Sequence, residues 1–160
     1  MTATATLFAA ACSAAAEVVI SRDCTDEPIE EFLADLAPGE ATVKDYANGR
    51  IRVVILSDRD AATGGTHVGI LHPGPGDTRL CRMLSGRADG SGWDAVNFSE
   101  KGATYDPSKG LTVPITVHSS AQAGDAPRKV DIVVNQASGE VAIALDTHGY
   151  PAEGVSRAPD

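Results

Sequence analysis

The stretch Ile51–Ser57, IRVVILS, decides the fold class of this chain of 160 residues. Side chains alternate between the two faces of a β-strand, and here both alternating sets are largely apolar. One set contains Ile51, Val53 and Ile55, and the other contains Val54 and Leu56. Because both faces of such a strand must be buried, the pattern predicts a strand in the centre of a sheet.

The neighbours of this strand predict antiparallel pairing on both sides. Asn48-Gly49 lies between residues 41–47 and the central strand, and this dipeptide is a strong short-range signal for a hairpin. Residues 66–84 read as a second hairpin, with its turn at the Pro- and Gly-rich residues 73–77.

Three further runs of alternating apolar residues follow a Gly-, Ser- and Asp-rich insertion at residues 85–110. The runs are residues 111–118, 130–134 and 141–145, and the sequence NQASGE between the last two predicts a hairpin. Pro114 interrupts the first run, which predicts an edge strand because proline cannot donate to a ladder.

The N-terminal part predicts a short strand in residues 17–24 and then an amphipathic helix in residues 25–40. Ile29, Phe32, Leu33 and Leu36 follow helical spacing and share one face, while acidic residues occupy the other. Pro38-Gly39 ends the pattern. The fold expected is therefore mainly β (α+β): an antiparallel sheet or sandwich of about 7–8 strands with one helix near the N-terminus.

The first sixteen residues contain no charged side chain and end in small residues, as a secretory signal does. We expect residues 1–16 to be a signal-like segment, residues 17–148 a single β-rich domain and residues 149–160 a flexible tail. An ordinary buried helix is the alternative for the first segment, because no Lys or Arg follows the methionine.

Export explains the cysteine count. Removal of the first segment takes away Cys12 and leaves Cys24 and Cys81, an even pair in an oxidising compartment. We therefore predict a Cys24–Cys81 disulfide and a secreted or periplasmic location. Two unpaired thiols in a cytosolic structural subunit are the alternative.

The net charge of −9 excludes nonspecific attraction to nucleic acid or anionic lipid, since phosphates would be repelled. No apolar stretch reaches the roughly 20 residues that a membrane-spanning helix needs. The chain has no HxH, HExxH or CxxC spacing, so the sequence predicts no metal site and no cofactor.

The segment ADGSGWDAVNFSE, residues 88–100, invites comparison with a calcium-binding loop. An EF-hand loop carries oxygen ligands at positions 1, 3, 5 and 12 and a glycine at position 6. Counted from Asp89, Glu100 falls at position 12, but Trp93 and Asp94 occupy positions 5 and 6, so the motif fails. An irregular calcium site using Asp89 and Asp94 stays open.

This same insertion contains the predicted partner-binding residues Trp93, Asp94 and Phe98, because functional contacts gather on loops held by rigid scaffolds. The alternative for Trp93 is a buried anchor of the loop. The acidic helix face, with Glu30 and Glu31, is either a second docking surface or a solvated face.

No motif along the chain predicts catalysis. The G-x-S-x-G elbow is missing, and the acids cluster on one helix face and not across a cleft. We therefore expect an exported, non-catalytic, β-rich binding or interaction module whose partner, protein or small molecule, and oligomeric state are open. The alternative is a small exported hydrolase with a Ser/His/Asp site assembled by folding, with His118 or His148 as the base.

Overall fold

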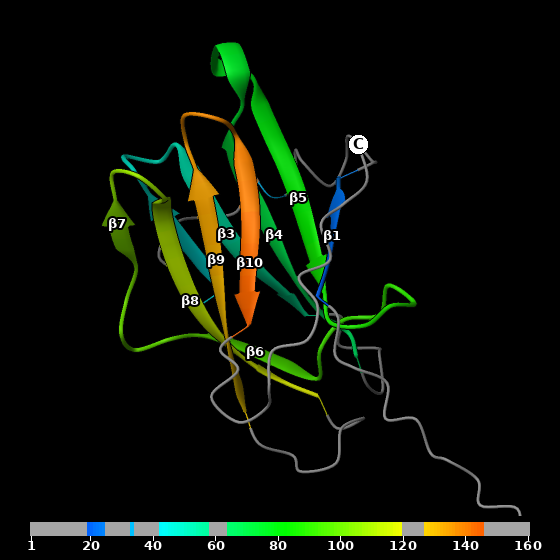
Figure 1. The fold of residues 1–160 in the computed structure, drawn as a ribbon. Helices are drawn as coiled ribbons and strands as arrows, with labels where there is room; N and C mark the ends of the chain where they lie inside the picture. Colours follow the sequence, from blue (N-terminus) through cyan, green and yellow to red (C-terminus); the bar gives the residue numbers. More distant parts are fainter. Residues whose placement is uncertain (1–18, 25–32, 34–41, 58–63, 120–126, 146–160) are drawn as a thin grey trace, which may run out of the picture.

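The computed structural model describes residues 19–24, 33, 42–57, 64–119 and 127–145. The predicted signal-like segment, the tail and the predicted helix, except Leu33, lie outside these residues. The described residues form two antiparallel sheets of five strands each, packed face to face as a sandwich (Figure 1). The antiparallel sandwich is thus confirmed, with ten strands where about 7–8 were expected.

The first sheet has the strand order β1-β5-β4-β3-β2. Its strands are β1 (Ile20–Asp23), β2 (Val43–Tyr46), β3 (Ile51–Ser57), β4 (Thr66–Pro73) and β5 (Arg79–Ser85). A 3₁₀ turn, η1 (Pro75–Asp77), joins β4 to β5, as the Pro- and Gly-rich turn predicted. β3 lies between β2 and β4, so its central position is confirmed.

The second sheet has the order β10-β9-β8-β6, with β7 pairing the same edge of β8 as β6. Its strands are β6 (Ala95–Phe98), β7 (Thr104–Asp106), β8 (Gly110–His118), β9 (Arg128–Asn135) and β10 (Glu140–Leu145). The two short strands β6 and β7 lie inside the segment that was expected to be irregular, which accounts for part of the higher strand count.

The main core lies between the sheets and contains mostly β-branched and leucine side chains. Val113 and Ile115 of β8 and Ile132 of β9 face Val53 and Ile70 of the first sheet in one buried cluster. Each of these side chains is at most 1% exposed. They occupy alternate positions along each strand and therefore point to the same face of the sheet. Burial of this apolar area is the main driving force of the fold.

A second, smaller core covers the outer face of the first sheet. It contains Leu33, Val43, Val54, Leu71 and Cys81. Leu33 lies directly over Gly69 of β4, where a Cβ atom would approach the Leu33 Cδ1 atom to 2.7 Å. The first sheet is therefore apolar on both faces, as the alternation in IRVVILS predicted.

The prediction that the Pro114 strand lies at an edge is wrong, because β8 is central in the second sheet. Pro114 lies opposite the gap between β6 and β7. β6 pairs with β8 as far as Phe98 opposite Ile115, and β7 pairs with β8 from Thr104 opposite Thr112. The Pro114 carbonyl accepts a hydrogen bond from Ser99 N on this side. In an antiparallel strand the N and C=O of one residue point the same way, so the missing N–H faces the gap and costs no ladder bond.

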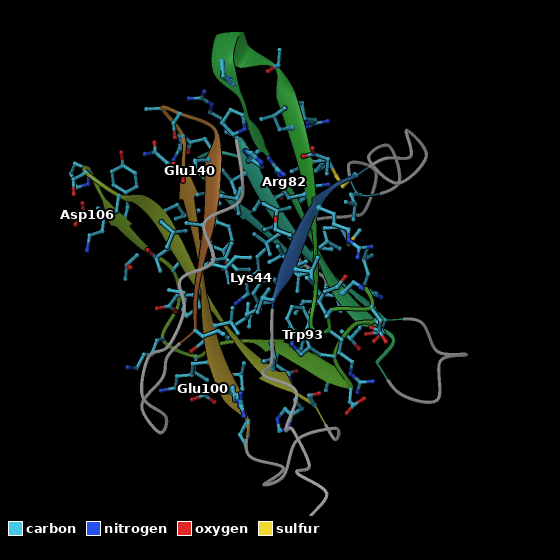
Figure 2. All side chains as sticks on the ribbon, turned by 45° about the vertical axis from the view of Figure 1, so that its right-hand side comes forward. Lys44, Arg82, Trp93, Glu100, Asp106 and Glu140 are labelled. Atoms are coloured by element: carbon cyan, nitrogen blue, oxygen red, sulfur yellow. A yellow bond between two sulfur atoms is a disulfide. The ribbon has the colours of Figure 1, made fainter. Side chains whose placement is uncertain are left out.

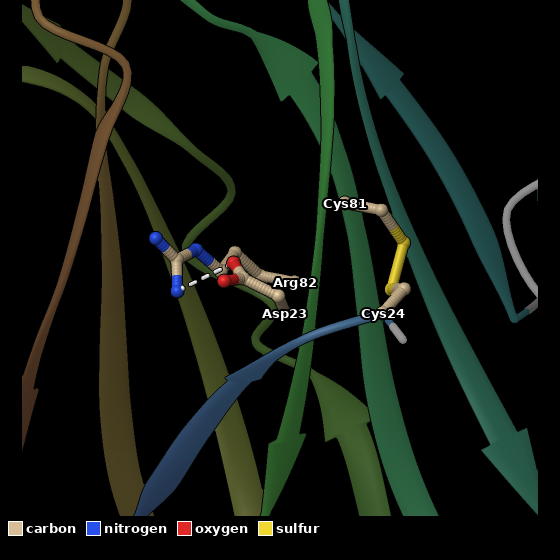
Figure 3. The surroundings of a disulfide bond; sticks show 4 residues. All are labelled: Asp23, Cys24, Cys81 and Arg82. Carbon is tan, nitrogen blue, oxygen red and sulfur yellow. Dashed lines mark ion pairs between the residues drawn. A yellow bond between two sulfur atoms is a disulfide. The ribbon is translucent and has the colours of Figure 1, made fainter. Parts of the chain in front are cut away.

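The predicted disulfide joins Cys24 to Cys81, across a sequence separation of 57 residues. The next residue on β5, Arg82, forms an ion pair with Asp23, with Arg82 Nη1 2.8 Å from Asp23 Oδ1. Figure 3 shows the two pairs on opposite sides of β1 and β5, as strand alternation requires. The disulfide thus belongs to the outer core, and the ion pair lies on the face of β1 and β5 that is directed toward the second sheet.

His72 on β4 is a buried histidine. It is 1% exposed, its Nδ1 donates to the Pro73 carbonyl oxygen at 3.2 Å, and its Nε2 has no partner among the described residues. Burial lowers the pKa of His72, and the positive charge of Arg82 lowers it further against the opposing effects of the Pro73 hydrogen bond and Asp23. The neutral ring is therefore the stable form in the fold.

His72 should make the stability depend on pH. In the unfolded chain the ring titrates near 6.5, and in the fold it stays neutral to lower pH. As the pH falls below 6.5, the unfolded state therefore binds the proton first, and stability is lost as the pH falls through the folded pKa. We expect urea midpoints measured between about pH 5 and 8 to fall less steeply with acid in His72→Gln than in the unsubstituted chain. His118→Gln is the control and should keep the full slope; equal slopes in all three proteins would contradict this assignment.

Candidate functional site

Residues 85–94 form a compact loop after β5, and hydrogen bonds hold this loop against the start of β4. Trp93 and Thr66 form an isolated bridge, with Thr66 N donating to Trp93 O at 2.9 Å and Trp93 N donating to Thr66 O at 2.8 Å. Gly92 N donates to Gly64 O, and Gly64 N donates to Asp94 Oδ1 at 2.8 Å. The insertion is therefore a rigid part of the sandwich up to β6.

Trp93 lies in the main core with its side chain 0% exposed (Figure 2). A Cβ atom at Gly86 would lie 2.5 Å from the Trp93 ring, so glycine at that position leaves the space that the indole fills. This placement corresponds to the buried-anchor alternative. A side chain without exposed surface offers no contact to a partner.

The two acids considered for calcium are engaged in separate contacts. Asp89 accepts hydrogen bonds from Ser91 N at 2.9 Å and Ser91 Oγ at 2.6 Å, which lower the pKa of its carboxyl. Asp94 holds Gly64 N and lies 3.7 Å from Arg87 Nη2. Within the described ranges, no three His, Cys, Asp or Glu side chains are grouped so that they could bind a metal ion.

Phe98 lies at the end of β6 and is half-buried, and Lys44 of β2 reaches it from the other sheet. The Lys44 Nζ atom is 4.6 Å from the centroid of the Phe98 ring, a cation–π distance. Lys44 itself is exposed. The contact joins the edge strand of the first sheet to the edge of the second on one side of the sandwich.

Two tyrosines extend the same side. Tyr46, two residues beyond Lys44 on β2, is half-buried against the main core, and burial raises the pKa of its hydroxyl. Tyr105 on β7 is 64% exposed and is the one large hydrophobic side chain with such exposure in the described part of the chain. We call Lys44, Tyr46, Phe98 and Tyr105 the aromatic edge; it contains every described aromatic residue except Trp93.

Sequence reasoning identified Phe98 and missed the other three members of the aromatic edge. Lys44 and Tyr46 precede Phe98 by about fifty residues, and their proximity follows from the packing of β6 against β3 and β4 at the β2 side. Tyr105 carried a signal that could have been used: an aromatic residue beside the turn formers Asp106-Pro107 in a polar segment. Glu30 and Glu31, the predicted second surface, lie outside the described residues.

One of the two histidines considered as catalytic bases lies within the described residues. His118 ends β8, and His148 lies outside the described residues. The fold instead places His67 Nδ1 3.0 Å from Ser85 Oγ, across neighbouring strands on the outer face of the first sheet. Ser85 is 5% exposed, so its hydroxyl is closed to a substrate.

Comparisons of the chain with protein-family models, curated proteins and solved structures gave no match. Among the described residues, no helix has the length and apolar character to span a membrane. The functional argument therefore rests on the aromatic edge and on the contacts that hold it in place.

Gly92 should tolerate no side chain. A Cβ atom at Gly92 would overlap sterically with the carbonyl oxygen of Thr66, whereas a Cβ atom at Gly102 would meet nothing within 4 Å. We expect Gly92→Ala to lower the free energy of unfolding by about 3 kcal/mol, because two backbone segments must separate. Gly102→Ala, the control, should cost about 1 kcal/mol, from its left-handed backbone alone.

Urea titrations followed by tryptophan fluorescence measure both values, since Trp93 is the single tryptophan and lies next to Gly92. Equal losses for the two variants would show that the loop is not fastened to β4 in solution.

Proposed function

We propose that this protein is an exported, non-catalytic binding module that contacts its partner through the aromatic edge. The observation that carries the proposal is the arrangement of Lys44, Phe98 and Tyr105 along one side of a rigid sandwich. Tyrosine and other aromatic residues contribute a large share of the energy at protein interfaces, and loops on rigid scaffolds are their usual location.

The location outside the cytosol is supported by two independent features. The uncharged segment 1–16 is typical of a secretory signal. The Cys24–Cys81 disulfide is of the kind that persists in secreted and periplasmic proteins and is rare in the cytosol.

The aromatic edge suits a partner that offers carboxylates or acceptor oxygens beside apolar groups. Lys44 supplies the only positive charge of the four side chains, and the ring of Phe98 beneath it keeps the ammonium group at the surface. Tyr46 and Tyr105 each offer a hydroxyl together with an apolar ring. Such a mixed surface is typical of contacts with proteins or glycans.

A photo-crosslinking amino acid at position 105 should form adducts in cells of the native organism that export the protein. The same probe at Ser138, an exposed residue of the β9–β10 turn, is the positional control and should form no adduct with a different protein. Lys44→Ala should reduce the adducts several-fold, because it removes the charge beside Phe98, while Lys109→Ala, also an exposed lysine, should not. Equal adducts at positions 105 and 138 would contradict the proposed surface.

The alternative, an exported hydrolase, has one observation in its favour, the His67–Ser85 hydrogen bond. A serine nucleophile must be reached by its substrate, and Ser85 is buried. We therefore expect a fluorophosphonate probe to leave the protein unlabelled, as measured by intact mass. Labelling that is lost in Ser85→Ala and retained in Ser91→Ala would favour the hydrolase over the binding module.

A further inference from the structure

The strand β10 forms an open edge of the second sheet. It pairs with β9 along its whole length, from Glu140 opposite Asn135 to Leu145 opposite Val130, and with no other described strand. Alternate residues of an edge strand direct their N–H and C=O groups away from the sheet, where they can pair with another strand.

Natural edge strands are usually short, charged or covered, and most edges of this sandwich follow that rule. β1 carries Arg22 and Asp23, β2 carries Lys44 and Asp45, and β6 and β7 have only four and three residues. β10 is the exception. It has six residues, EVAIAL, without proline, glycine or a basic residue, and its single charge is Glu140 at the first position.

We propose that β10 pairs antiparallel with β10 of a second copy of this chain, so that the second sheets of the two copies continue into one another. Residues directly opposite each other in an antiparallel pair point to the same face. A two-fold pairing centred on Ala142 or Ile143 therefore extends the inner row of Val141, Ile143 and Leu145 from one copy into the other.

The charges on the edges select this strand for self-pairing. With the two-fold axis at Ala142 or Ile143, the two Glu140 carboxylates lie at opposite ends of the ribbon, no closer than about 14 Å along the strand. The same operation on β2 places Lys44 opposite Lys44, or Asp45 opposite Asp45, and like charges directly opposite are destabilising. Charge repulsion therefore opposes self-pairing of β2 and does not oppose self-pairing of β10.

The side chains of β10 leave room for the second copy. Ala142 and Ala144 are exposed and small on the outer face, while Val141, Ile143 and Leu145 are only partly buried at the margin of the main core. The second copy would cover that margin with the same three side chains. The β9–β10 turn also packs against the end of β4, since a Cβ atom at Gly139 would lie 3.0 Å from Gly74 Cα, so little conformational freedom is lost on pairing.

Sedimentation equilibrium of the full chain, with its disulfide intact, tests the proposal between roughly 1 μM and 1 mM protein. We expect a monomer–dimer equilibrium that tightens with added salt, because each copy carries a net charge of −9. The double variant Ala142→Glu/Ala144→Glu places acids opposite acids in either register and should weaken the dimer at least tenfold at low salt.

The matched control is Asn97→Glu/Thr104→Glu, which adds the same charge at exposed positions on the other edge of the same sheet. It should change the dissociation constant less than threefold. Hydrogen exchange of the unsubstituted chain gives a second measurement that needs no variant: alternate amides of β10 should become protected as the concentration rises. A monomer throughout, a dimer equally sensitive to both double variants, or concentration-independent exchange in β10 would each overturn the proposal.

Discussion

The first sheet is apolar on both faces, and the rest of the structure follows from the need to cover both. The alternation of Ile51, Val53 and Ile55 with Val54 and Leu56 leaves β3 without a face that can be left in water. The second sheet covers one face, with which it forms the main core. The other face is covered by Leu33, which comes from a distant part of the chain, and is bordered by the disulfide.

The disulfide has a structural role at the outer core. Cys81 is one of five buried side chains that form this core among the described residues, and Cys24 packs against it. The Cys24–Cys81 bond joins the residue after β1 to β5 and closes a loop with a sequence separation of 57 residues. On the chain-entropy model a loop of this length contributes about 4 kcal/mol, comparable with the net stability of many domains. Conditions that keep this disulfide oxidised therefore also stabilise the outer core.

Local patterns were enough to predict most of the strands but not what surrounds each one. The alternation in residues 111–118 and 141–145 and the pairing of Cys24 with Cys81 were read correctly from the sequence. Pro114 was misplaced because the gap between β6 and β7 that accommodates it depends on two strands too short to recognise. Glycines beside Trp93 suggested an exposed loop, whereas Gly86 leaves room for the indole and Gly92 lets the backbone approach residues 64 and 66 closely. Lys44 and Phe98 meet only once the sheet order is known, so the candidate site could be predicted only in part.

The two proposed surfaces lie at opposite edges of the second sheet, and this separation has a consequence for binding. β6 and β7 lie at one edge, where Lys44 of β2 meets Phe98, and β10 lies at the other edge. Pairing through β10 therefore leaves the aromatic edge of each copy uncovered and turns the two edges away from each other. Such a dimer presents two copies of a weak binding surface, and when a partner is itself repeated, the second contact forms at high effective concentration. In the proposed dimer, a surface of four side chains would act twice on such a repeated partner.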